Sequence, residues 1–169
     1  QFFPDHWEDF VRPIPEDERD DLVGSYAQQM QGTNELKRMA AAKAWSAWSG
    51  HCATVQPHQR LIHHYSDARR ALSRCKVGTH YHANRCFLEA DEPLTNMPTI
   101  RHLPATIVHG RFDMVCPLEN AFRLHRAWTG AQLFIVRDAG HSATEPTIID
   151  ALIRATRDMA SRFEEQFGV

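Results

Sequence analysis

Two short apolar runs separated by a helix-like stretch constrain the fold more than any other feature of the chain. Residues 105–110 (ATIVHG) and 132–136 (QLFIV) have the length and composition of buried strands. Residues 118–128 lie between them with apolar side chains at helical spacing, and residues 146–167 show the pattern of a long amphipathic helix. The apolar face of that last helix is expected to include Ile149, Leu152, Ile153 and Phe163. The order strand, helix, strand, helix predicts two parallel strands joined by a right-handed crossover.

The first 100 residues show a different pattern. Residues 15–32, 34–50 and 67–86 have the spacing of helices, and Gly50 is expected to end the second of them. Helix-rich segments with few β-branched residues form lids or bundles rather than sheets. The sequence therefore predicts a helical domain over residues 1–100, separate from the α/β unit that follows.

Composition and charge exclude several classes of protein. The 169 residues are 43% hydrophobic, which suffices for one ordinary domain or for two small lobes, and the net charge of −2 gives no reason to expect nucleic-acid binding. No run of 18 apolar residues indicates a membrane span, and the first residues do not have the pattern of a signal peptide. Four cysteines without CxxC spacing are expected to be free thiols in a reducing compartment, so a cytoplasmic protein is predicted.

No cofactor and no metal site are predicted. His63, His64, His80 and His82 lie close together in the sequence, but histidines two positions apart point to different sides of a helix, and no third matched ligand accompanies them. Cys116 is expected to be a buried structural thiol, because no cationic group is arranged in the sequence to lower its pKa.

Two polar residues follow the predicted strands shortly after each strand ends. Asp113 follows the first strand in HGRFDMVCP, and His141 follows the second in DAGHSATEP. The carboxyl ends of parallel strands meet at one edge of a sheet, where ligands bind. A buried carboxylate there can fix the tautomer of an imidazole, which then acts as the base for a hydroxyl or thiol nucleophile. The alternative is that each residue only forms a turn or caps a helix.

Several longer stretches resemble the proline iminopeptidase family of α/β hydrolases. They are FFPDHWEDF, PIPEDERDDL, AWSAW, HGRFDMVCPLENA, LHRAW and DAGHSATEP, and they occur in the family's order over nearly the whole chain. The resemblance implies a helical cap domain over residues 1–100. It also implies that residues 101–169 hold the last two parallel strands and helices of an α/β-hydrolase catalytic domain with an incomplete sheet. Asp113 and His141, 28 positions apart, would then be the acid and base of a serine triad.

The nucleophile of such a triad is missing from the sequence. In the family it lies on a G-x-S-x-G turn, and none of the seven serines has glycine on both sides at the required spacing. The chain is therefore expected to be a C-terminal fragment that is inactive alone. Because parallel sheets are normally covered on both faces, the fragment is expected to need a partner, either the N-terminal half of the same enzyme or a second copy of itself.

The expected substrate is a peptide with N-terminal proline, or a small amide or ester. The candidate substrate-binding residues are Trp45, Trp48, Ser49, Gly78 and Tyr81. The resemblance implies cap carboxylates that hold the substrate's free amino group, but Ser49 and Gly78 stand at the two expected positions. Two alternatives therefore remain, a hydrolase of other ester or amide specificity and a non-catalytic descendant that only binds.

Overall fold

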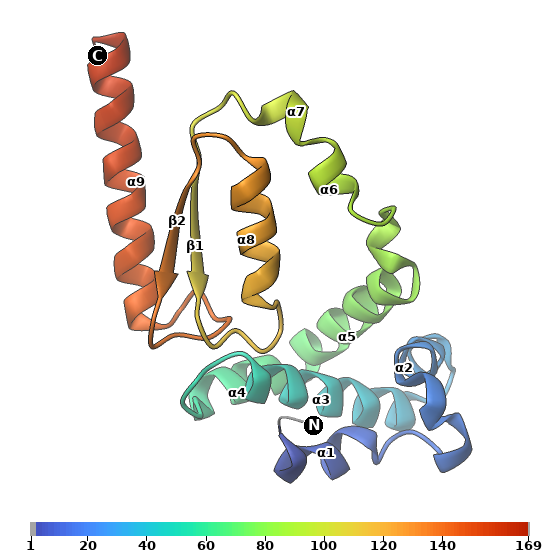
Figure 1. Cartoon of the computed structure of the whole chain (residues 1–169). Coiled ribbons are helices and arrows are strands. Elements are labelled where there is room, and N and C mark those ends of the chain that lie inside the picture. Colours follow the sequence, from blue (N-terminus) through green and yellow to red (C-terminus); the bar gives the residue numbers. More distant parts are fainter. Residues whose placement is uncertain (1–2, 169) are drawn as a thin grey trace. The chain divides into compact units, whose positions relative to one another are not determined.

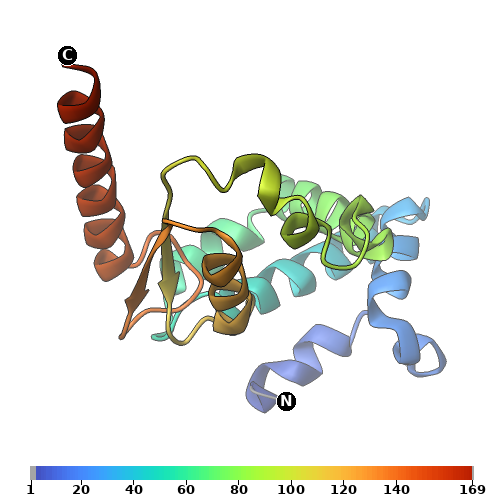
Figure 2. The same cartoon turned by 45° about the horizontal axis from the view of Figure 1, so that its top comes forward.

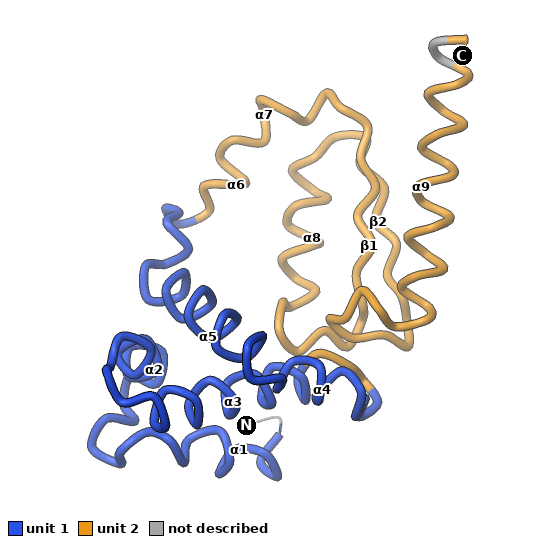
Figure 3. Tube along the Cα trace, turned by 180° about the vertical axis from the view of Figure 1, so that it is seen from behind, with its two compact units in different colours: residues 1–52, 56–90 blue, residues 53–55, 91–169 orange. Residues whose placement is uncertain are grey.

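The computed structural model describes residues 3–168, apart from the side chains of residues 166 and 167. It divides the chain into two compact units (Figure 3). Unit 1 comprises Gln1–Cys52 and Gln56–Ala90, and unit 2 comprises Ala53–Val55 and Asp91–Val169. The division therefore falls about ten residues before the boundary expected from the sequence, and a short segment of the first half belongs to the second unit.

Unit 1 is entirely helical in its regular structure. Its elements are α1 (Pro4–Val11), the 3-10 helix η1 (Glu16–Asp21), α2 (Leu22–Gln31), α3 (Glu35–Cys52), α4 (Gln59–Ser66), α5 (Ala68–Ala83) and the 3-10 helix η2 (Arg85–Phe87) (Figure 1). Local sequence explains several helix starts. Asp21 accepts a hydrogen bond from the Gly24 N–H at the start of α2, and Asp67 accepts one from the Arg70 N–H at the start of α5. The short helices α1 and α4 add to the three helices expected from the sequence.

Gly50 does not end α3, contrary to the expectation from the sequence. The helix continues to Cys52, and Gly50 lies where α3 packs against α4. A Cβ atom at Gly50 would lie only 3.2 Å from the Cα of Ile62. The residue is therefore a contact point between two helices, and its missing side chain allows their backbones to approach closely.

The core of unit 1 is built around aromatic side chains. Phe10 and Tyr26 stack with ring centroids 5.1 Å apart, and the Tyr26 hydroxyl donates a hydrogen bond to the Phe10 carbonyl oxygen. Trp45 and Trp48 of α3 pack against Phe10. Other members of this buried cluster are Val11, Ile14, Met30, Ala41, Ala42, Ala71 and Cys75. The helices thus close an apolar core among themselves.

Unit 2 contains the predicted α/β arrangement. Its elements are α6 (Glu92–Thr95), α7 (Met97–Ile100), β1 (Thr106–Gly110), α8 (Leu118–Ala127), β2 (Gln132–Val136) and α9 (Pro146–Phe167). The two strands are parallel and pair in register from Thr106 with Gln132 to Gly110 with Val136. Helices α8 and α9 each contact both strands and lie on opposite sides of them, and α9 extends past the strand ends (Figures 1 and 2). The parallel pair expected from the sequence is confirmed.

The apolar surfaces of unit 2 are less well covered. Of the ten strand residues only Gly110 is buried. In α9 the buried apolar residues include Ile148 and Ala155. The apolar face expected from the sequence is largely exposed, because Ile149, Leu152, Ile153 and Phe163 are each about 40% accessible or more. Helix α9 therefore has more apolar surface than two strands can cover. Among the residues that the structure describes, no helix combines the length and hydropathy needed to cross a membrane.

Candidate active site

The loops that follow β1 and β2 are held together by their backbones. The Arg111 N–H donates to the Val136 carbonyl oxygen and the Phe112 N–H to the Ala139 carbonyl oxygen, both at 2.9 Å. A Cβ atom at Gly110 would lie 2.7 Å from the Ala139 carbonyl oxygen. Glycine at the end of β1 thus permits a close approach of the two loops, which brings Asp113 beside His141.

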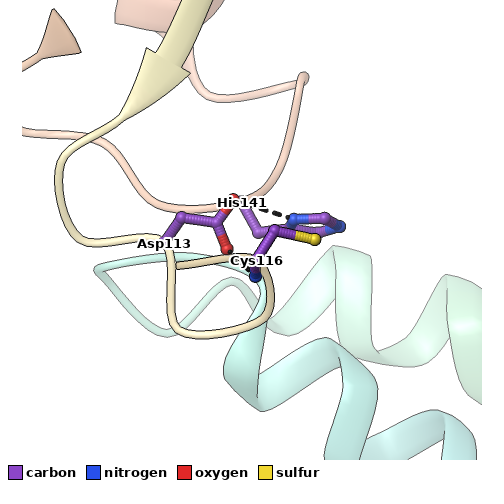
Figure 4. A group of neighbouring side chains, drawn as sticks. All are labelled: Asp113, Cys116 and His141. Carbon is purple, nitrogen blue, oxygen red and sulfur yellow. Dashed lines mark hydrogen bonds and ion pairs between the residues drawn. The ribbon is translucent and has the colours of Figure 1, made fainter. Parts of the chain in front are cut away.

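The carboxylate of Asp113 is fixed at both oxygens. Oδ1 accepts hydrogen bonds from the backbone N–H groups of Val115 at 2.9 Å and Cys116 at 2.7 Å. Oδ2 lies 3.0 Å from Nδ1 of His141. Only 6% of the Asp113 side chain is exposed. The geometry expected for an acid and its histidine is therefore confirmed in this unit (Figure 4).

The loop that carries His141 is anchored by residues distant in the sequence. The N–H groups of His141 and Ser142 both donate to the carbonyl oxygen of Ala53, at 3.0 and 2.8 Å. The Glu145 carboxylate accepts from the Gly140 N–H at 2.7 Å and from the Val55 N–H at 3.3 Å. These contacts explain why a short segment around Ala53 belongs to unit 2, and they hold the backbone on both sides of the imidazole.

This arrangement suits general-base chemistry. A carboxylate only accepts hydrogen bonds, so the proton between Asp113 and His141 belongs on Nδ1, and Nε2 carries the lone pair. The His141 side chain is 41% exposed, whereas that of Asp113 is only 6% exposed. The imidazole is thus accessible to a reacting group, and the carboxylate beside it is shielded from water.

A second histidine adjoins the same carboxylate. Nε2 of His109, on β1, lies 3.7 Å from Oδ2 of Asp113, and its Nδ1 lies 2.9 Å from the Gly110 carbonyl oxygen. The His109 side chain is 15% exposed. The sequence analysis did not predict this neighbour of Asp113. The position of His109 on the predicted strand, four residues before Asp113, could have indicated it.

Cys116 is exposed, so the expectation of a buried structural thiol is wrong. It follows Asp113 in a loop whose backbone turns to donate to the carboxylate, and this turn holds the side chain at the surface. Partial burial of the thiol and the nearby Asp113 carboxylate raise the pKa of Cys116. The thiol is therefore protonated at neutral pH and is not an activated nucleophile.

The five candidate substrate-binding residues all lie in unit 1, on two helices. Trp45, Trp48 and Ser49 are on α3, and Gly78 and Tyr81 are on α5. A Cβ atom at Gly78 would lie 3.6 Å from Nε1 of Trp45, so the structure brings these two positions together.

The other candidates make separate contacts. Trp48 packs in the aromatic core, with its ring 4.9 Å from that of Phe10. The Ser49 hydroxyl donates to the Trp45 carbonyl oxygen of its own helix at 2.8 Å. Tyr81 is half exposed and packs against Phe87. Their role in substrate binding remains a prediction.

A hollow of about 360 Å³ on unit 1 has a positively charged lining. It is bordered by His64, Tyr65, Arg69, Arg70, Ser73 and Arg74. The guanidinium of Arg74 lies 3.7 Å above the ring of Tyr65. Its charge makes this hollow unsuitable for the ammonium group of a peptide.

Comparisons with known proteins find similar sequences over most of the chain. No protein-family model matches it. It is 42% identical over 161 residues to the proline iminopeptidase of Xanthomonas citri, which is 95% of this chain and 51% of that enzyme. Identity to the Arabidopsis thaliana proline iminopeptidase is 39% over 159 residues, covering 93% of this chain and 42% of the relative.

Another relative and one solved structure also match the chain. A proline iminopeptidase of Neisseria meningitidis is 34% identical over 160 residues, covering 94% of this chain and 50% of the relative. Among solved structures, an esterase from Exiguobacterium antarcticum aligns with a TM-score of 0.49 and 20% identity, covering 91% of this chain and 54% of that one. The chain is therefore related to the proline iminopeptidases and corresponds to a C-terminal portion that makes up about half of their length.

Proposed function

We propose that this chain supplies the acid and base of a serine hydrolase of the proline iminopeptidase type, which releases N-terminal proline from peptides. The observation that carries the proposal is the 3.0 Å contact between Oδ2 of the shielded Asp113 carboxylate and Nδ1 of the exposed His141. The relatives are about twice as long as the chain. The serine nucleophile and the donors that stabilise the oxyanion would come from the part of the enzyme that this chain does not match.

In this proposal His141 performs both proton transfers. Its Nε2 takes the proton from the serine hydroxyl as the oxygen attacks the carbonyl carbon, and it later gives that proton to the leaving amine. Asp113 holds the imidazole in the required tautomer and stabilises the imidazolium that forms. The two backbone N–H groups on Oδ1 keep the carboxylate oriented during these steps.

The half-covered sheet of unit 2 supports a partner for this chain. Parallel strands are normally buried on both faces, whereas every residue of β2 is at least partly exposed. The N-terminal half of the same enzyme would extend the sheet and bury these residues. Self-association through the same surface is the alternative partner.

A second candidate function is hydrolysis of another amide or ester on the same framework. Recognition of a free amino group needs negative charge in a partly desolvated pocket, because an unpaired buried ammonium is costly. Ser49 offers a hydroxyl already bonded within its helix, and Gly78 offers no side chain beside Trp45. Asp91, an acidic residue that follows Gly78 in the sequence, forms an ion pair with Arg123, with Oδ1 and Nη2 2.6 Å apart. Its charge is therefore already paired. These observations favour weak discrimination between free and acylated substrates.

A chimaera tests both functions. It joins the part of the Xanthomonas citri enzyme that precedes the matched segment to this chain, and turnover is measured on a prolyl-arylamide, its N-acetyl form and a small aryl ester. Preference for the free prolyl substrate supports the peptidase, and equal turnover of the acylated or ester substrate supports the second candidate. A folded chimaera that turns over none of them supports a binding protein instead.

Placing carboxylates at positions 49 and 78 distinguishes the two candidate functions further. If the missing acids weaken amine recognition, the double variant Ser49→Glu, Gly78→Glu raises kcat/KM for the free prolyl substrate by at least about tenfold, since losing a buried charge partner typically costs about 2–5 kcal/mol. The acetylated substrate gains nothing. The matched control is Ser49→Gln, Gly78→Gln, which has the same size and the same helix-stabilising effect without the charge.

A further inference from the structure

We infer that Asp113, Cys116 and His141 form a binding site for a zinc-like divalent metal ion, and that metal bound there switches off the acid and base. The metal would inhibit, and it would not be a cofactor. The inhibitory consequence rests on the proposed function, whereas the binding itself does not.

The geometry of the three side chains carries this inference. One carboxylate oxygen, the cysteine sulfur and one imidazole nitrogen all lie within 4.8 Å of one another (Figure 4). Ligand atoms of a tetrahedral zinc site lie about 3.3–3.8 Å apart, given Zn–N and Zn–S distances of about 2.0 and 2.3 Å. Reaching that geometry needs a movement of about 1 Å. Cys116 is exposed and the His141 side chain is 41% exposed, so both can rotate to make it.

The donor set matches the chemistry of zinc. Nitrogen, sulfur and oxygen are its three usual protein ligands, and sites with three protein ligands leave a position for water. Asp113 is already oriented, because backbone N–H groups occupy Oδ1 and leave Oδ2 directed toward His141. Hard cations such as Mg²⁺ prefer sets made of oxygen alone, so they are disfavoured here.

Coordination changes the protonation of the site in a defined way. The metal ion bonds to the sulfur as the Cys116 thiol gives its proton to solvent, so one proton is released for each thiolate formed. Where the metal bonds to Nδ1 of His141, the proton on that nitrogen moves to Nε2 by way of solvent, and the imidazole stays neutral. No oxidant or reductant takes part. Metal held by the carboxylate and the imidazole keeps Asp113 and His141 from sharing a proton, and the pair then no longer serves a nucleophile.

The test measures metal binding by this chain directly and needs no turnover. The 169-residue chain is titrated with Co²⁺, whose bonds to thiolate give a charge-transfer absorption, and then with Zn²⁺ in competition. The chain has eleven histidines, so weak background binding is expected and the thiolate signal is the specific readout. The variant is Cys116→Ser, and the matched control is Cys86→Ser, which removes the other exposed free cysteine.

The inference predicts one equivalent of bound metal and a thiolate band in the unmodified chain and in Cys86→Ser. In Cys116→Ser the band is lost and Zn²⁺ binds at least about tenfold more weakly, because a hydroxyl is a poorer zinc ligand than a thiolate. A band that persists in Cys116→Ser, or no band in the unmodified chain, overturns the inference.

A second measurement avoids substitutions altogether. Imidazole nitrogen resonances of the unmodified chain are followed by NMR as Zn²⁺ is added, and His141 is expected to shift first. Shifts confined to other histidines, such as His63, His64, His80 and His82, contradict the site. Failure of metal binding leaves the proposed hydrolase unaffected, and an inactive chimaera leaves the metal site unaffected, so the two outcomes are distinguishable.

Discussion

Large apolar side chains have different surroundings in the two units. In unit 1, Phe10 and Tyr26 are almost completely buried among other aromatic rings. In unit 2, alanines predominate among the buried apolar residues, with Met97 and Ile148 as the largest. Most of the exposed large apolar side chains of the described chain belong to unit 2, and they include Phe112, Phe122, Phe134, Ile149, Leu152 and Ile153.

The difference shows how packing and chemistry are distributed along the chain. Unit 1 completes its own core, whereas unit 2 presents polar loops at the end of a sheet that is only partly covered. A sheet of two strands has too few neighbours to bury both faces. The chain covers about half the length of its relatives.

The largest expected effect concerns the chemistry of unit 2. In the chimaera, Asp113→Asn should lower kcat by about 10⁴-fold, because an amide no longer holds the histidine in the tautomer that accepts a proton. Asp138→Asn is the control, since Asp138 is an exposed acid in the turn after β2. Comparable activity in the two variants would show that the Asp113–His141 contact is structural only.

The next effect contrasts two phenylalanines. Phe10→Ala in the closed core should cost about 3–5 kcal/mol of unfolding free energy. Phe134→Ala on β2 should cost about 1 kcal/mol or less, because this side chain is 43% exposed. Urea unfolding of both variants, followed by circular dichroism, gives the two values. Similar costs would mean that unit 2 covers its strands as well as unit 1 covers its core.

Alkaline pH should destabilise the core of unit 1. Burial raises the pKa of the Cys75 thiol from its ordinary value near 9 to about 12. Above pH 9 the unfolded chain therefore loses this proton more readily than the folded chain, and the free energy of unfolding falls as pH rises from about 9 toward 12. Cys75→Ala should make this decline shallower, while replacement of the exposed Cys86 should leave its slope unchanged. Equal slopes in all three proteins would contradict the burial of Cys75.

The smallest effect compares two helical glycines within unit 1. Gly50→Ala should destabilise by about 1–2 kcal/mol, since the new Cβ would press on the backbone of Ile62. Gly78→Ala should instead stabilise by up to about 1 kcal/mol, because its Cβ makes an ordinary contact with Trp45 and alanine favours the helix. Thermal unfolding should show opposite shifts. Stabilisation by both substitutions would mean that the α3–α4 contact yields easily.

Short-range patterns predicted much of unit 2. The strands, their parallel pairing and the meeting of Asp113 with His141 all follow from local periodicity and from the rule that strand ends share one edge. Gly50 shows the limit of such patterns. A glycine in an alanine-rich helix can mark either the end of that helix or a close contact with another helix, and the local pattern is the same in both cases. Only the position of Ile62 distinguishes the two.

Contacts between distant residues could not be predicted in this way. Glu145 accepts a hydrogen bond from the N–H of Val55, 90 positions earlier, and Ala53 accepts two from the His141 loop. The donors in all three bonds and the Ala53 acceptor are backbone groups, which every residue possesses, and the carboxylate of Glu145 gives no sign in the sequence of which distant N–H it accepts from. The exposure of Cys116 is likewise a consequence of the turn around Asp113 and not of its own chemistry.

The proposed role of unit 2 depends on whether His141 activates a nucleophile that lies outside this chain. The direct measurement is the rate at which a fluorophosphonate labels the serine of the chimaera, because that reaction needs the base but no peptide specificity. Stoichiometric labelling is predicted for the unmodified chimaera and for His102→Ala, which alters an exposed histidine of unit 2. His141→Ala should react at least about 10³-fold more slowly. Labelling of His141→Ala at the unmodified rate would contradict the assignment of His141 as the base.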